Sequence, residues 1–224
     1  TATAIRGMRF DLYRGETVAI VGESGSGKSV TMKAVMGIIS NNQHIDHGSI
    51  RYSWWDENGQ KQTVDIAKMG SRDVRSKICG RHISMVFQDS MTSLNPTVTI
   101  GNQIIEGMLE HYKLTKEEAK ARAIKLLEEV GIKNPEKRFK QYPHQLSGGM
   151  CQRVGIAIAL ACDPDILICD EPTTALDVTI QLKMLNLIKK IQKEKQISVV
   201  YITHDLGVVA KVADYVCVMY AGRI

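Results

Sequence analysis

The chain has 224 residues, of which 44% are apolar and 24% charged, and its formal net charge is +5. These values are typical of a soluble globular protein that has one domain, with or without an added lobe, around a sizeable core. The longest apolar stretches are too short to cross a bilayer, and no signal peptide is visible at Thr1. We therefore expect a soluble chain that reaches a membrane only through a partner.

The first part of the chain alternates short apolar runs with helical segments. We expect a strand at residues 17–21, a helix at 29–39, and further strands at 49–54 and 83–88. Residues 55–61 are polar and contain an Asn-Gly pair, which predicts a hairpin turn.

The middle of the chain changes to a helical period between residues 100 and 130. Thr115 is expected to cap the second helix of this stretch, with Glu118 as the capping-box acid, and Gly131 to end it. Strands and helices then alternate again from residue 166. The expected elements are 166–169, 178–193, 197–203, 206–212 and 215–219.

This order predicts an α/β fold with a mainly parallel sheet, an antiparallel β lobe and an inserted α-helical lobe. Residues 1–96 and 163–224 are expected to form the core with the β lobe, and residues 97–162 the helical lobe.

A glycine-rich loop lies between the first expected strand and helix, and residues 22–29, Gly-Glu-Ser-Gly-Ser-Gly-Lys-Ser, match GxxxxGK[ST]. Backbone N–H groups of such a loop point at phosphates, Lys28 reaches the β- and γ-phosphates, and the Ser29 hydroxyl can ligate Mg²⁺. A plain turn ending in Lys-Ser is the alternative, but both flanks favour the core of a P-loop NTPase (RecA-like). The expected nucleotide contacts are Gly22, Glu23, Ser24, Gly25, Ser26, Gly27, Lys28, Ser29 and Val30.

Two carboxylates end the apolar run that begins at residue 166. A strand carries Asp170 and Glu171 to the carboxyl edge of a parallel sheet, where ligands usually bind. Asp170 suits the Mg²⁺ shell, and Glu171 suits the polarising of an attacking water. A surface acidic turn is the alternative, and the phosphate-binding loop makes it less favoured.

A second glycine-rich segment, Leu-Ser-Gly-Gly-Met at residues 146–150, precedes a helical run. Ser147, Gly148 and Gly149 resemble an anion-binding helix start, although a plain helix cap would explain them when taken alone. Gln152 and Arg153 extend the match beyond that minimum.

Taken in order, these motifs resemble the nucleotide-binding domain of the ABC superfamily over nearly the whole chain. Gln88 then matches the Q-loop, Ser147 with Gly148 and Gly149 the signature, Asp177 the D-loop and His204 the switch histidine. The resemblance implies ATP and Mg²⁺ as cofactors. It implies catalytic roles for Lys28, Gln88, Glu171 and His204, nucleotide contacts for Asp177 and the signature, and metal contacts for Ser29, Gln88 and Asp170.

The resemblance also implies partners. Two such domains pair head to tail, so that the signature of one copy closes on the nucleotide of the other, and the pair drives two transmembrane permease subunits. The chain would then lie at the cytoplasmic face of the membrane, held there by the permeases. An extracellular solute-binding protein would act indirectly, and no nucleic acid is expected.

Three short sequence segments indicate which branch of the superfamily the chain resembles. Residues 87–96, with Ser90 where Pro is usual, 142–145 and 174–181 resemble the ATPases of peptide and nickel importers. They favour oligopeptide or dipeptide uptake, with nickel or glutathione uptake as alternatives. A repair or translation ATPase of the superfamily is disfavoured because the gap from Gln88 to Ser147 is short and the chain has one ATPase unit. An inactive regulatory subunit is disfavoured because the catalytic set is complete.

Some features depart from the family pattern. Cys151 occupies a position where a polar residue is common, and we expect it to weaken a surface contact at most. No convincing aromatic partner for adenine lies in the short stretch before Gly22, so we expect it upstream of Thr1 or missing, and the chain to be trimmed. Phe10 and Tyr13 are expected to pack in or beside the β lobe. The five scattered cysteines are expected to be free, mostly buried thiols of a reducing cytosol.

Overall fold

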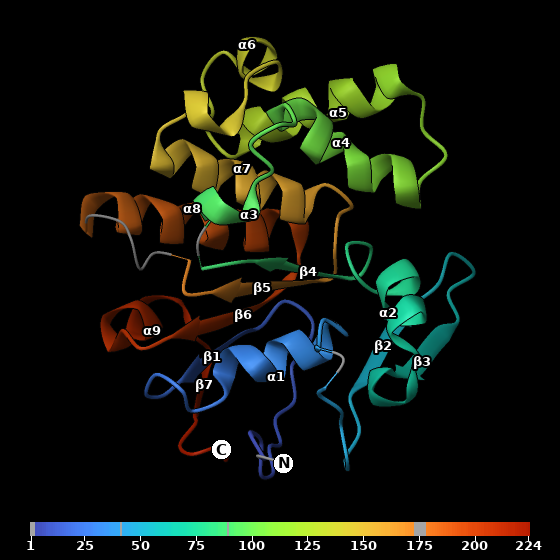
Figure 1. Ribbon diagram of the computed structural model, residues 1–224, viewed down its shortest axis with the longest axis vertical. Coiled ribbons are helices and arrows are strands. Elements are labelled where there is room, and N and C mark those ends of the chain that lie inside the picture. The colour runs from blue at the N-terminus through green and yellow to red at the C-terminus, as the bar shows by residue number, and fades with distance from the viewer. Residues whose placement is uncertain (1–2, 41, 89, 173–177) are drawn as a thin grey trace.

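A computed structural model describes residues 3–40, 42–88, 90–172 and 178–224. A parallel sheet of five strands in the order β4-β5-β6-β1-β7 forms its centre, which confirms the predicted α/β fold (Figure 1). Because the strands are parallel, the loops that follow them meet at one edge of the sheet. The strands are β1 Thr17–Val21, β4 Ile83–Val86, β5 Ile166–Asp170, β6 Ser198–Thr203 and β7 Tyr215–Val218.

Both faces of the sheet are covered, as the continuous apolar runs of its inner strands require. Along β1, Ala19 and Val21 join one hydrophobic cluster, whereas Val18 and Ile20 join a second cluster on the opposite face. Helices α7 Gly148–Leu160 and α8 Val178–Lys195 lie on one side of the sheet, and α1 Lys28–Val35 lies on the other (Figure 1).

The middle of the chain is helical, as predicted. It comprises α4 Ile100–His111, α5 Lys116–Glu129 and α6 Pro135–Phe139, followed by α7. The buried side chains Ile104 and Met108 of α4 belong to the same hydrophobic cluster as Ala19 of the sheet, so the helical region and the sheet share one continuous core.

Helix α5 begins with the predicted capping box. The Thr115 hydroxyl accepts a hydrogen bond from the Glu118 N–H at 3.2 Å, and the Glu118 carboxylate accepts one from the Thr115 N–H at 2.8 Å. We expect Thr115→Ala to lower the free energy of unfolding by about 1 kcal/mol, because it removes a side-chain cap. Urea unfolding would measure the loss, and an unchanged midpoint would show that the cap contributes nothing.

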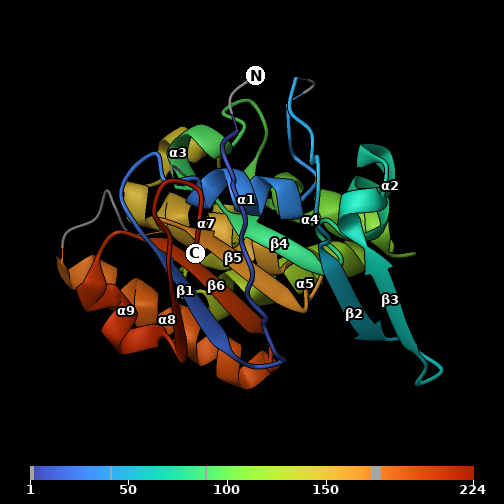
Figure 2. The ribbon, with the colours of Figure 1, turned by 90° about the horizontal axis from the view of Figure 1, so that it is seen from below.

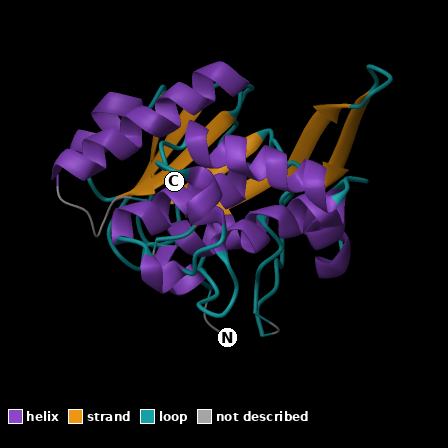
Figure 3. Ribbon diagram, turned by 90° about the horizontal axis from the view of Figure 1, so that it is seen from above, coloured by secondary structure: helices purple, strands orange, loops and turns teal. Residues whose placement is uncertain are grey.

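The predicted antiparallel lobe is the hairpin of β2 Arg51–Trp55 and β3 Lys61–Asp65, which lies apart from the main sheet (Figures 2 and 3). Phe10 packs against the cluster beneath this lobe, as expected, whereas Tyr13 is 65% exposed and the expectation for it was wrong. The remaining helices are α2 Ser71–Lys77, α3 Ser90–Ser93 and α9 Leu206–Val212, with short 3₁₀ turns at Ile66–Lys68 and Pro143–Gln145.

All five cysteines are free, and three of them, Cys151, Cys162 and Cys169, are buried, as predicted. Among the residues described, no helix combines the length and the apolar character needed to cross a membrane.

Candidate nucleotide site

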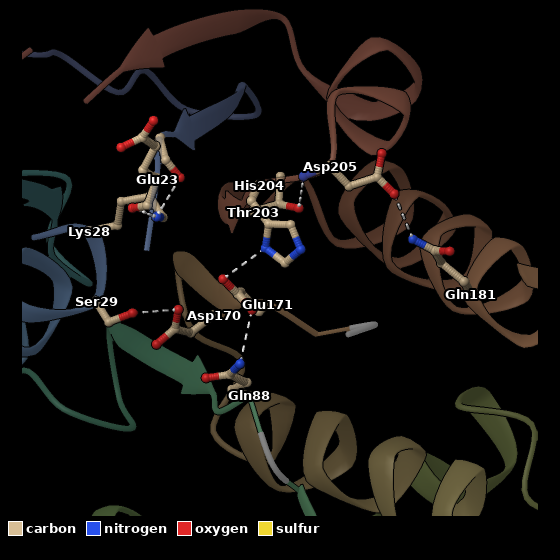
Figure 4. Close-up of polar contacts among 11 residues, drawn as sticks. Glu23, Lys28, Ser29, Gln88, Asp170, Glu171, Gln181, Thr203, His204 and Asp205 are labelled. Atoms are coloured by element: carbon tan, nitrogen blue, oxygen red, sulfur yellow. Dashed lines mark hydrogen bonds and ion pairs between the residues drawn. The ribbon is translucent and has the colours of Figure 1, made fainter. Parts of the chain in front are cut away.

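The sheet topology brings the predicted site residues together. The phosphate-binding loop follows β1, Gln88 follows β4, Asp170 ends β5 and His204 follows β6. These strands are neighbours in the sheet, so residues far apart in the sequence meet at its carboxyl edge (Figure 4).

The loop between β1 and α1 has the backbone that its glycines allow. Gly25 and Gly27 have φ of 80° and 106°, in the left-handed region, and Gly27 caps α1. A Cβ atom on Gly27 would collide with the side chains of Ile5 and Met219. The loop is thus closely packed on one side: a larger residue at Gly27 would displace these two side chains and would strain a backbone with positive φ.

Lys28 is buried, with 5% of its surface exposed, and its ammonium group turns back over the loop. The Nζ atom donates hydrogen bonds to the carbonyl oxygens of Gly22 at 2.7 Å and Glu23 at 2.8 Å (Figure 4). This cation is held at the loop that the sequence assigns to phosphates. An anionic phosphate would compete with these two neutral acceptors for the ammonium group.

Ser29 and Asp170 are paired beside the loop. The Ser29 hydroxyl donates to Asp170 Oδ1 at 2.8 Å. Burial raises the pKa of the Asp170 carboxyl above its ordinary value; the Ser29 hydrogen bond opposes the rise and the nearby Glu171 carboxylate adds to it. A hydroxyl and a carboxylate are oxygen donors of the kind that Mg²⁺ prefers, and a bound dication would favour the charged form of Asp170.

Glu171 lies between two other predicted site residues. Its carboxylate accepts a hydrogen bond from Gln88 Nε2 at 2.9 Å and contacts His204 Nδ1 at 3.1 Å (Figure 4). Its backbone has φ of 45°, unusual for a residue with a side chain, and its N–H donates to the Ile202 carbonyl at 2.9 Å. The side chain is 16% exposed, so it is accessible to water at the sheet edge.

The second glycine-rich segment forms the start of α7. Ser147 is the N-cap residue, but its hydroxyl accepts no capping hydrogen bond, and both Ser147 and Gly148 are exposed. Among the described residues, no hydrogen bond joins this segment to the phosphate-binding loop of the same chain. The helix start is therefore presented outward, with its first N–H groups unused by a side-chain cap.

Cys151 corrects the sequence-based expectation of a weakened surface contact, because it is fully buried in α7. Its thiol donates to the Pro143 carbonyl at 3.5 Å. The sequence analysis gave Gln152 no role beyond extending the motif. Its place one helical turn after Gly149, as a polar residue, could have indicated a role in the site. Asp177 and the string 174–177 lie outside the described residues.

Comparisons with known proteins agree with this geometry. Residues 5–174 match the ABC transporter family. The chain belongs to this family. The ABC chain is 52% identical to the dipeptide transport ATP-binding protein DppD of Bacillus subtilis (strain 168), covering all of this chain and 64% of that protein. It is 54% identical to the oligopeptide transport ATP-binding protein OppD of the same organism, covering 99% and 59%.

The chain spans about 60% of the length of these curated relatives. Among solved structures, the ATP-binding cassette MJ0796 in a dimeric post-hydrolysis state, bound to ADP and Pi, superposes with a TM-score of 0.81 at 28% identity. That match covers 99% of this chain and 88% of MJ0796. The resemblance to an ABC cassette is therefore confirmed, and the relatives' names fall in the predicted peptide branch.

Proposed function

We propose that the chain binds and hydrolyses ATP to energise an ABC importer, with oligopeptides or dipeptides as the transported solute. The observation that carries this proposal is the edge of the sheet where Lys28, the Ser29–Asp170 pair and Glu171 meet. This edge belongs to a chain that is about half identical to ATP-binding proteins of peptide transport.

The phosphates of ATP would lie in the loop of residues 22–29 and on the start of α1, down to Val30. Lys28 would exchange the Gly22 and Glu23 carbonyls for the β- and γ-phosphates, gaining charge-assisted hydrogen bonds. Ser29 and Asp170 would hold Mg²⁺, with Gln88 contributing its amide oxygen. The metal would neutralise charge on the phosphates and orient them for transfer.

Glu171 would polarise the water that attacks the γ-phosphate, since its carboxylate is accessible to water. His204, now 3.1 Å from that carboxylate, would leave it to contact the γ-phosphate. Gln88 donates a hydrogen bond to Glu171 at 2.9 Å. Phosphate binding would therefore change contacts that Gln88 and His204 already make with the Glu171 carboxylate. Lys28, Gln88, Glu171 and His204 form the proposed catalytic set.

The outward-facing start of α7 supports a head-to-tail dimer. Ser147, Gly148 and Gly149 of one copy would close on the nucleotide of the other, and Asp177 would lie at the same interface. This arrangement uses a helix start that the chain itself leaves exposed. We further propose the division into a core of residues 1–96 and 163–224 and a helical lobe of residues 97–162.

Transport would require two permease subunits, with a solute-binding protein outside the cell. The chain would be held at the cytoplasmic face of the membrane by these permeases. The names of the relatives favour peptides over nickel or glutathione as the solute.

Affinity purification of the full protein from its native membrane, in mild detergent, tests the transport assignment. We expect two polytopic membrane proteins and an ATPase partner, either a second copy or a sister subunit, in the eluate. Recovery with ribosomes or with DNA ends, and without membrane proteins, would contradict it.

A further inference from the structure

A buried amide connects the start of α7 to the turn that carries Glu171. Gln152 is only 5% exposed, and its Nε2 atom donates a hydrogen bond to the carbonyl oxygen of Pro172, the residue directly after Glu171. The other amide atom, Oε1, has no hydrogen-bond partner among the described residues. Burying a polar group costs free energy unless the group forms hydrogen bonds.

The turn at Glu171 has an unusual backbone and is bonded to other elements of the fold. Glu171 has a left-handed φ of 45°, which costs a residue with a side chain about 1–2 kcal/mol. Pro172 has no N–H and therefore cannot donate a backbone hydrogen bond itself. Among the residues that the structure describes, the Glu171 N–H bonds to the Ile202 carbonyl on one side of the turn, and Gln152 bonds to the Pro172 carbonyl on the other.

We propose that Gln152 is a positioning residue, which fixes the Pro172 carbonyl and thereby the direction in which the Glu171 carboxylate points. This inference rests on the proposed function, because it assumes that Glu171 serves hydrolysis. On α7, Gln152 lies one helical turn beyond Gly148 and Gly149. The helix therefore joins the segment that would close on a partner's nucleotide to the carboxylate that serves the chain's own nucleotide.

The neighbouring residue supplies a matched control. Arg153 also reaches from α7 to a backbone carbonyl, through Nη1 to Val130 at the end of α5. This contact ties the same helix to the helical region and touches no proposed site residue. Substitution of either side chain by Met keeps its approximate length and removes one donor to one carbonyl.

The test compares Gln152→Met with Arg153→Met in the full protein together with its copurifying subunits. We expect Gln152→Met to lower kcat for ATP hydrolysis about tenfold or more, because small displacements of a catalytic group are costly. KM for ATP should stay within about twofold, since nucleotide binding is not altered. Arg153→Met should leave kcat within about twofold. Equal kcat values for the two variants, at equal thermal midpoints, would overturn the proposal.

Gln152→Glu gives a second readout, the pH dependence of kcat, which a purely structural role of Gln152 would not change. A carboxylate cannot donate to the Pro172 carbonyl, but the protonated acid can, and burial favours the protonated form. The ratio of its kcat to that of the wild type should therefore rise as pH falls from 8.5 to 6, whereas the ratio for Gln152→Met should stay flat. Two flat ratios would contradict the proposal.

Loss of turnover in Glu171→Gln, measured alongside, shows whether Glu171 serves hydrolysis; if that variant stays active, the proposed function fails as well.

Discussion

Glu171→Gln is expected to lower the rate of ATP hydrolysis at least about 100-fold, while ATP still binds. The amide has the shape of the carboxylate and its oxygen still accepts a hydrogen bond from Gln88, but it cannot take a proton from water. Bound ATP would then persist, and two chains would stay joined around it. Phosphate release measures turnover, and size-exclusion chromatography with and without ATP measures the dimer.

The control for this variant is Glu57→Gln, which removes a carboxylate on the exposed turn between β2 and β3. It should hydrolyse ATP at the rate of the wild type. A Glu171→Gln protein with more than about a tenth of the wild-type rate would remove Glu171 from its role, because loss of a general base costs more than that.

Lys28→Met is expected to weaken ATP binding about 10- to 100-fold, since hydrogen bonds to a charged group contribute about 1.5–3 kcal/mol. The buried ammonium group bonds to two loop carbonyls in this structure. Methionine has a similar length but no N–H donor, so neither these carbonyls nor the phosphates of bound ATP would receive its hydrogen bonds. Titration of the protein with ATP in a calorimeter measures the affinity.

Lys120→Met is the matched control, because Lys120 is an exposed lysine on α5 of the helical region. It should bind ATP within about threefold of the wild type, as expected for the loss of an exposed charge worth less than 1 kcal/mol. Equal affinities for the two variants would show that the nucleotide does not use the loop lysine.

The apolar runs predicted the sheet well. Each strand of the parallel sheet lies at or within two residues of its predicted bounds. Four of them, β1, β4, β5 and β6, are buried, and buried parallel strands need continuous apolar sequence. The first helix was expected to reach residue 39 but ends at Val35. Gly37, with φ of 62°, ends it, and the Gly37 N–H bonds back to the Ala34 carbonyl.

Shorter elements escaped the sequence pattern for a physical reason. Helix α2 buries Val74 alone, so it has no apolar stripe from which a helical period could be recognised. Cys151 was expected near the surface because polar residues are common at that position. Its burial follows from how α7 packs between α4 and β4, a long-range contact that no local pattern contains.

For the candidate site, the sequence predicted that the strand beginning at residue 166 would carry Asp170 and Glu171 to the carboxyl edge of a parallel sheet, and the structure places them there. The sequence did not predict that Lys28 would turn back onto Gly22 and Glu23, or that Gln88 and His204 would both contact Glu171. Those contacts depend on side-chain directions at residues far apart in the chain. The roles of the site residues stay predictions until nucleotide binding is measured.

A crystal structure of the Glu171→Gln protein grown with ATP and Mg²⁺ tests most directly whether two chains share each nucleotide. We expect two copies related head to tail, the triphosphate wrapped by the backbone N–H groups of residues 22–29 of one copy, and Ser147 and Gly149 of the other copy within hydrogen-bonding distance of the γ-phosphate. A structure in which that loop is empty and the phosphates bind elsewhere would contradict the account.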